Sequence, residues 1–135
     1  MELIKWTDAY SVGIKEIDNQ HKGLVTIIND LFGYMSKGKA KNNLGEIFDH
    51  LTDYTKLHFS TEEKILAKYA YPDFFNHKKE HVEFVNKLVT FKKNFDEGRK
   101  EVSIEILSFL RDWLLNHIQL SDKKYSKHLR IYIEE

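Results

Sequence analysis

The chain has 135 residues, of which 41% are hydrophobic and 31% charged, the balance of a globular protein that buries one core. The 21 basic residues equal the 21 acidic ones, so no positive excess indicates a nucleic-acid partner. The absence of Cys excludes disulfides and thiolate sites, so any metal would be held by nitrogen and oxygen.

No stretch approaches the roughly 18 apolar residues that predict a membrane span. Residues 1–10 also lack the basic and then apolar pattern of a signal peptide. We therefore expect no membrane span and a cytoplasmic location.

Apolar periodicity predicts an all-α protein. Residues 1–17 lack helical spacing, which indicates an extended N-terminal arm, and Asp18 is the expected N-cap of a first helix that stops at Gly38. Short connections between amphipathic helices predict a single domain with an up-down-up-down four-helix bundle. The predicted elements are an arm at residues 1–17, helices at 19–37, 43–69, 73–96 and 102–120, and a short helix or tail at 121–135.

The third predicted helix carries two histidines on its apolar face. His77 and His81 lie four residues apart on a stripe that runs from Phe74 to Phe95, where a core would normally take Leu or Phe. Two imidazoles at this spacing can bind one metal ion. Taken alone, a buried histidine is more often a hydrogen-bonded core residue, so the pair needs support from other helices.

The other predicted helices place polar residues on the same inward faces. His21 lies on the first helix, His58 and Glu62 on the second, and His117 on the fourth. Five imidazoles and a carboxylate would therefore converge in the middle of the bundle. A metal-free core would have to pair each of these groups at a high desolvation cost, so a metal centre is the favoured interpretation.

Asp122 is a candidate ligand that regular helix geometry leaves open. It follows His117 by five residues and would lie about 140° away around an α-helix. The helix would have to end, tighten or bulge near Ser121 for both side chains to reach one site. Glu63 and Asp112 share no face with a candidate ligand, and His50 and His128 belong to no such group and are expected to be ordinary surface or rim residues.

Seven candidate ligands are too many for one zinc ion, which takes four. They suit two six-coordinate ions that share bridging ligands, and a mixture of imidazole and carboxylate suits iron. If Glu62, Asp122 and a solvent oxygen all bridge, three histidines complete one ion and two histidines leave the other with a vacant position. Reversible binding of a small ligand requires such a vacancy.

These residues resemble the hemerythrin family in its single-domain bacterial form. The likeness extends to the arm, through Trp6 and the segment Val12-Gly13-Ile14, and it covers nearly the whole chain with no departure at a ligand position. The motifs that carry it are Ile17-Asp18-Asn19-Gln20-His21, His58-Phe59-Ser60-Thr61-Glu62, His77-Lys78-Lys79-Glu80-His81 and His117-Ile118-Gln119-Leu120-Ser121-Asp122.

The resemblance implies a non-haem di-iron centre that binds dioxygen reversibly, for storage, delivery or buffering, and that serves an oxygen-consuming acceptor protein. It implies that one iron is held by His77, His81 and His117, that the iron with the vacancy is held by His21 and His58, and that Glu62, Asp122 and an oxo or hydroxo group bridge them. Five neutral imidazoles favour binding over oxygen–oxygen cleavage, so we expect a protein that is not an enzyme. The alternatives are a di-iron enzyme, a protein that handles nitric oxide or peroxide, a sensor of oxygen or iron, and a structural metal site.

The pocket for oxygen should be apolar and dry. Helical spacing places four apolar side chains one turn from the candidate ligands: Leu24, Val25, Trp113 and Leu114. The resemblance instead suggests Leu115, two residues before His117, as a wall of the pocket.

Overall fold

The computed structural model describes residues 3–99 and 101–133. These residues form helices and turns and no strand, which confirms the predicted all-α class. The elements in chain order are η1 (Asp8–Tyr10), α1 (Lys15–Ser36), α2 (Ala40–Lys68), α3 (Phe74–Asp96), α4 (Val102–Trp113), the π-helical segment η2 (Leu114–Asp122) and α5 (Lys123–Ile133).

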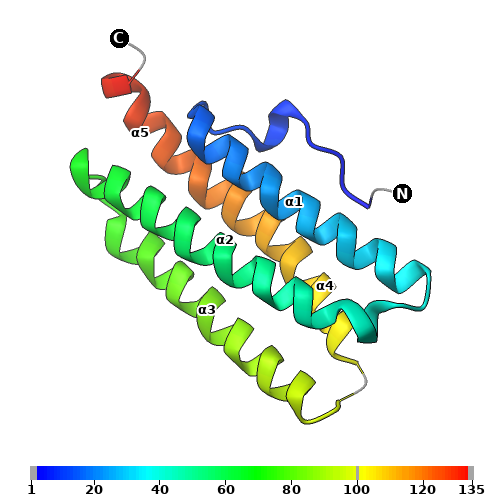
Figure 1. The fold of residues 1–135 in the computed structure, drawn as a ribbon. Helices are drawn as coiled ribbons and strands as arrows, with labels where there is room; N and C mark the ends of the chain where they lie inside the picture. Colours follow the sequence, from blue (N-terminus) through cyan, green and yellow to red (C-terminus); the bar gives the residue numbers. More distant parts are fainter. Residues whose placement is uncertain (1–2, 100, 134–135) are drawn as a thin grey trace.

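Helices α1 to α4 run up-down-up-down as a bundle, as predicted (Figure 1). Helix α5 continues the line of α4 through η2, so the expected tail is helical in its described part. Glycines in the left-handed region end α1 and α3, at Gly38 with φ 68° and at Gly98 with φ 81°. This conformation suits glycine because it has no Cβ, and it confirms Gly38 as a stop. None of the described helices is long and apolar enough to cross a membrane.

Two apolar clusters fill the bundle and leave a polar layer between them. The larger cluster contains residues such as Leu24, Phe59, Phe84 and Leu114, one turn from the candidate ligands on one side. The smaller cluster lies on the other side of the candidate ligands. Its buried members are Val12, Ile17, Leu66, Tyr71, Tyr125 and Leu129. The candidate ligands are therefore enclosed by apolar side chains at both ends.

The expected start of the first helix is wrong by four residues, because α1 begins at Lys15. Asp18 is not its N-cap but lies in its first turn, where a carboxylate favours the positive end of the helix dipole. Its carboxylate accepts hydrogen bonds from the Ser11 hydroxyl at 2.6 Å and from the Val12 N–H at 2.8 Å. Asp18 therefore joins the arm to α1.

The arm runs along the outside of α1 (Figure 1). The Asn29 side chain accepts from the N–H groups of Leu3 and Ile4, each at 2.9 Å, and donates to the Ile4 carbonyl at 2.8 Å. At the other end of the arm, the Ser126 hydroxyl donates to the Val12 carbonyl at 2.5 Å. The arm thus links α1 to α5 and covers the end of the bundle that holds the smaller cluster.

Candidate metal centre

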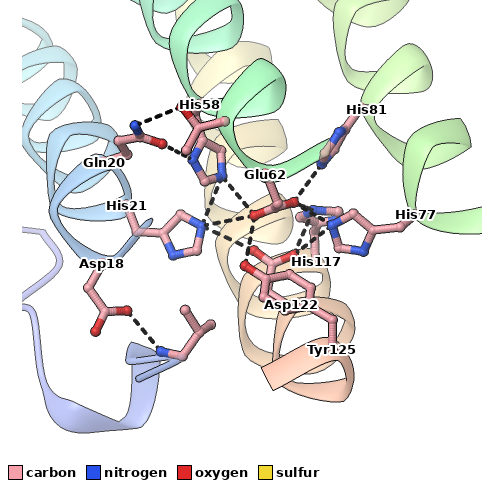
Figure 2. Close-up of polar contacts among 12 residues, drawn as sticks. Asp18, Gln20, His21, His58, Glu62, His77, His81, His117, Asp122 and Tyr125 are labelled. Carbon is pink, nitrogen blue, oxygen red and sulfur yellow. Dashed lines mark hydrogen bonds and ion pairs between the residues drawn. The ribbon is translucent and has the colours of Figure 1, made fainter. Parts of the chain in front are cut away.

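Seven polar side chains meet in the layer between the two clusters, and each is at most 2% exposed. They are His21 from α1, His58 and Glu62 from α2, His77 and His81 from α3, and His117 and Asp122 from η2 (Figure 2). The structure therefore brings together all seven residues that the sequence indicates as candidate ligands.

The seven residues form two overlapping groups, within each of which one nitrogen or oxygen atom per residue lies within 4.8 Å of the others. The three-histidine group is Glu62, His77, His81 and His117, and the two-histidine group is His21, His58, Glu62 and Asp122. This division of the histidines is the one that the resemblance implies. Glu62 belongs to both groups.

Glu62 faces the two groups with different oxygens. Its Oε1 lies 2.8 Å from Nε2 of His81 and also contacts Nε2 of His77. Its Oε2 lies 3.1 Å from Nε2 of His58. A carboxylate that bridges two metal ions would need this arrangement, with one oxygen for each ion.

The π-helical segment explains how Asp122 reaches the centre. Backbone hydrogen bonds in a π-helix join residues five apart, so side chains at this spacing lie on one face. Asp122 Oδ1 accordingly lies 3.0 Å from Nε2 of His117, and Oδ2 lies 3.1 Å from Nε2 of His21 in the other group. The distortion that the sequence required near Ser121 is thus a segment of nine residues, Leu114–Asp122.

Three of the imidazoles have a polar partner on the ring nitrogen that faces away from the centre. His58 Nδ1 lies 2.7 Å from Gln20 Oε1, His81 Nδ1 lies 2.9 Å from Glu63 Oε2, and His117 Nδ1 lies 3.4 Å from Glu80 Oε1. Such partners orient an imidazole and leave its other nitrogen free for a metal. The sequence reasoning missed all three partners, although each is adjacent in the chain to a candidate ligand.

Two buried tyrosines complete the surroundings of Glu62 and His58. The Tyr125 hydroxyl donates to Glu62 Oε2 at 2.9 Å, and the Tyr54 ring stacks on His58 with centroids 5.1 Å apart. Burial, followed by the charge of Glu62, raises the pKa of both phenols well above its ordinary value. Both tyrosines therefore stay protonated at neutral pH.

The carboxyl groups of the centre are ionised although they are buried. Burial raises the pKa of Glu62. His58 and the other surrounding imidazoles lower it by more, so the pKa lies well below its ordinary value. Burial and Glu62 raise the pKa of Asp122, and His117 and His21 outweigh them, so this pKa is also low. The centre thus holds two negative charges in an apolar surrounding.

His77 and His117 differ from His58 in basicity. Burial lowers the pKa of His77, but the adjacent Asp122 and Glu62 carboxylates raise it overall to about 9. Burial likewise lowers the pKa of His117, and Asp122 beside it raises it to well above its ordinary value. In the two-histidine group, burial dominates and the pKa of His58 is lowered. Without a metal, protons are therefore held more readily by His77 and His117 than by His58.

The atoms that face the centre fit a cation better than they fit one another. His117 Nε2 and both oxygens of Asp122 form no hydrogen bond, despite neighbours at 3.0–3.1 Å. No Lys or Arg in the described part of the chain pairs with Glu62 or Asp122. Buried charges are normally paired or coordinate a metal, so the donor set fits a metal centre.

The comparisons with known proteins agree with this geometry. A family model described as the hemerythrin HHE cation binding domain matches residues 12–129. The chain belongs to the hemerythrin family. A bacteriohemerythrin of Methylococcus capsulatus is 36% identical over 126 residues, which are 93% of this chain and 95% of the relative. A bacteriohemerythrin of Clostridium acetobutylicum is 33% identical over 127 residues, covering 91% and 98%.

Solved structures lead to the same family. A crystal structure of wild-type hemerythrin matches with a TM-score of 0.83 at 36% identity, over 93% of this chain and 96% of that chain. The buried cluster of the present chain therefore suits a metal centre of the family's type.

Four of the five residues expected around the oxygen pocket are buried in this hemerythrin: Leu24, Val25, Trp113 and Leu114. The Trp113 ring stacks on His117, with centroids 3.9 Å apart and planes 12° apart. Leu115, which the resemblance suggested, is 41% exposed, so its placement as a pocket wall is wrong. Residues two apart on a helix lie on nearly opposite faces, and His117 takes the inner one.

The residues that were not expected to be ligands lie outside the cluster. His50 is exposed and lies 3.9 Å from Glu46 one turn earlier, and Asp112 is exposed on α4. The His128 ring donates to the Tyr69 carbonyl at 2.9 Å. Glu63 touches the centre only through the outer nitrogen of His81.

Proposed function

We propose that this hemerythrin binds dioxygen reversibly at a di-iron centre and serves to store, deliver or buffer oxygen. The observation that carries the proposal is the unequal division of histidines, three in one group and two in the other. The ligands would be His77, His81 and His117 for one iron, His21 and His58 for the other, and Glu62 and Asp122 as bridges. The iron with two histidines would keep one position open.

The residues around this open position support binding rather than catalysis. When bound, two ferrous ions supply the two electrons that dioxygen takes up and later returns. Five neutral imidazoles and only two carboxylates add little negative charge, so they do not favour the high-valent iron of carboxylate-rich di-iron enzymes. Buried apolar side chains such as Leu24 and Leu114 exclude water from the centre.

An enzyme would also need an acid or base beside the open position. Two buried phenol groups beside the centre belong to Tyr54 and Tyr125, and the pKa of each is raised well above its ordinary value. Neither releases a proton readily at neutral pH, and neither is a good proton acceptor. These side chains can hold a hydrogen bond, but they do not supply general acid–base catalysis.

An absorption titration tests the proposal. The reduced, iron-loaded chain should be colourless without oxygen and should gain a visible charge-transfer band in air, with two irons per chain by metal analysis. Removal of oxygen should reverse the band, and the zinc-loaded chain should show none. Irreversible bleaching would exclude the carrier function, and sustained turnover of peroxide or nitric oxide would favour the enzyme instead.

A further inference from the structure

Three surface crevices reach the outer side of a candidate ligand. A crevice of about 620 Å³ between α2 and α3 reaches His81, one of about 430 Å³ between α1 and α2 reaches His58, and one of about 350 Å³ between α3 and α4 reaches His117. The two apolar clusters enclose the centre at both ends, so these crevices between helices are candidate paths for a metal ion that approaches from solvent.

The charges on the three linings differ in sign. Three lysines outnumber two carboxylates around the α2/α3 crevice: Lys56, Lys78 and Lys92 against Asp49 and Glu63. The other two linings are acidic, with Glu16 and Asp53 between α1 and α2, and Glu80, Glu83 and Asp112 against Lys87 between α3 and α4. A cleft of one sign concentrates ions of the opposite sign, so a divalent cation is attracted to the last two.

The inner end of the α1/α2 crevice is occupied by groups that already have partners. The outer nitrogen of His58 lies 2.7 Å from Gln20 Oε1, and the amide of Gln20 donates in turn to the Thr61 hydroxyl at 3.2 Å. The Tyr54 ring covers one face of the same imidazole. A cation that enters here meets hydrogen-bonded neutral groups and no free carboxylate at the end of the path.

The α3/α4 crevice ends at His117, which has a carboxylate beside its outer nitrogen. His117 is 2% exposed and its Nδ1, which faces this crevice, makes no hydrogen bond. The Glu80 carboxylate lies 3.4 Å from that nitrogen. It also accepts a hydrogen bond at 3.0 Å from the hydroxyl of Ser121, the residue that precedes Asp122 in the chain. The Glu80 side chain is 37% exposed, so one carboxylate contacts both solvent and the centre.

Two further carboxylates lie on the outer part of this crevice. Glu83 and Asp112 are exposed, and neither has an ion-pair partner among the described residues. We propose that ferrous ions enter the centre through the α3/α4 crevice, where Glu83 and Asp112 attract them and Glu80 passes them to His117. This inference rests on the proposed di-iron centre and adds the route by which it is filled.

The rate of iron uptake by the metal-free full-length chain tests the route. Ferrous ion is added anaerobically at low ionic strength, samples are quenched with a ferrous chelator, and the helix content of each variant is checked first by circular dichroism. Glu83→Gln with Asp112→Asn should slow uptake about three- to tenfold, and the effect should disappear in high salt. The final iron content should remain that of the wild type.

Two matched variants make the test specific. Glu16→Gln with Asp53→Asn removes the same charge from the α1/α2 crevice and should change the rate by less than about twofold. Lys87→Glu adds negative charge to the α3/α4 crevice and should accelerate uptake, and this acceleration should disappear in high salt, which a loosened bundle would not reproduce. Equal slowing by both double variants, or no acceleration by Lys87→Glu, overturns the route while full loading leaves the proposed function standing. A wild-type chain that takes up no iron overturns both.

Discussion

The two groups of the centre are built from the same kinds of ligand but are supported differently. In the three-histidine group, His81 and His117 have carboxylates on their outer nitrogens, Glu63 and Glu80. In the two-histidine group, the outer nitrogen of His58 instead faces the neutral side-chain amide of Gln20. A carboxylate partner raises the basicity of an imidazole ligand more than an amide does. We expect the three-histidine group to hold its ion tightly and the other group to hold its ion more weakly.

This contrast suits a protein that exchanges a small ligand at one ion only. The group with His77 and His117 would anchor the proposed centre in the bundle, and the group with His58 would leave its ion responsive to what binds at the proposed open position. Glu62, with Oε1 in one group and Oε2 in the other, couples the two groups.

The largest effect should follow from removing this shared carboxylate. Glu62→Ala takes one oxygen from each group, so we expect iron to fall from two per chain to less than one. Metal analysis after anaerobic reconstitution measures this. Glu63→Gln changes the next residue, which contacts only the outside of His81, and should retain both irons. If Glu62→Ala also retains both, Glu62 is not a bridge.

Single histidine variants should separate the groups. His21→Ala should lose mainly the iron of the two-histidine group, whereas His77→Ala and His81→Ala should lose mainly the other, leaving about one iron per chain in each case. His50→Ala is the control, because His50 is exposed and outside both groups. Retention of two irons in all three ligand variants would refute the assignment.

The stability of the metal-free chain should depend on pH through the three-histidine group. The pKa of His77 is raised from 6.5 to about 9, so its contribution is fully present below 6.5 and is lost as pH rises through 9. The expected loss in the free energy of unfolding is on the order of 3 kcal/mol. The pKa of His58 is lowered, so this residue makes the free energy of unfolding fall as the pH drops below 6.5, which is the opposite trend in a lower pH range.

Iron should reverse this pH dependence, because imidazole must be deprotonated to bind a metal. Urea unfolding of metal-free and iron-loaded chains at several pH values between 6.5 and 9 measures both trends. We expect the gap between the two free energies of unfolding to widen as the pH rises. A gap that stays constant would show that the three-histidine group releases no proton when iron binds.

Most of the bundle and of the centre follows from helical spacing. His77 with His81 and His58 with Glu62 are separated by four residues, so their shared faces are visible as soon as a helix is predicted. The structure places both pairs inside α-helices with the same inward faces. Local periodicity is enough wherever the helix is regular.

Asp122 could not be placed in this way because it depends on an irregular helix. The π-helical hydrogen bonds of η2 leave no mark in the apolar pattern, which reads as a helix ending near 120. The start of α1 was missed for a related reason. Ile14 and Ile17 continue the alternation of the arm, although Ile17 is already helical and packs in the smaller cluster. The outer partners depend on contacts between helices, which one sequence does not show.

The smallest expected effect compares the outer partners directly. Gln20→Leu removes the acceptor on His58, and Glu63→Leu removes the acceptor on His81. Each should weaken the ion of its own group by about 10–100-fold, the usual cost of losing such a partner, and leave the other ion unchanged. Competition with a calibrated ferrous chelator measures the two affinities. Gln20→Glu completes the comparison, because it gives His58 the kind of partner that His81 has and should tighten the two-histidine ion. If Gln20→Glu leaves both affinities unchanged, the contrast between the groups arises from burial and not from their outer partners.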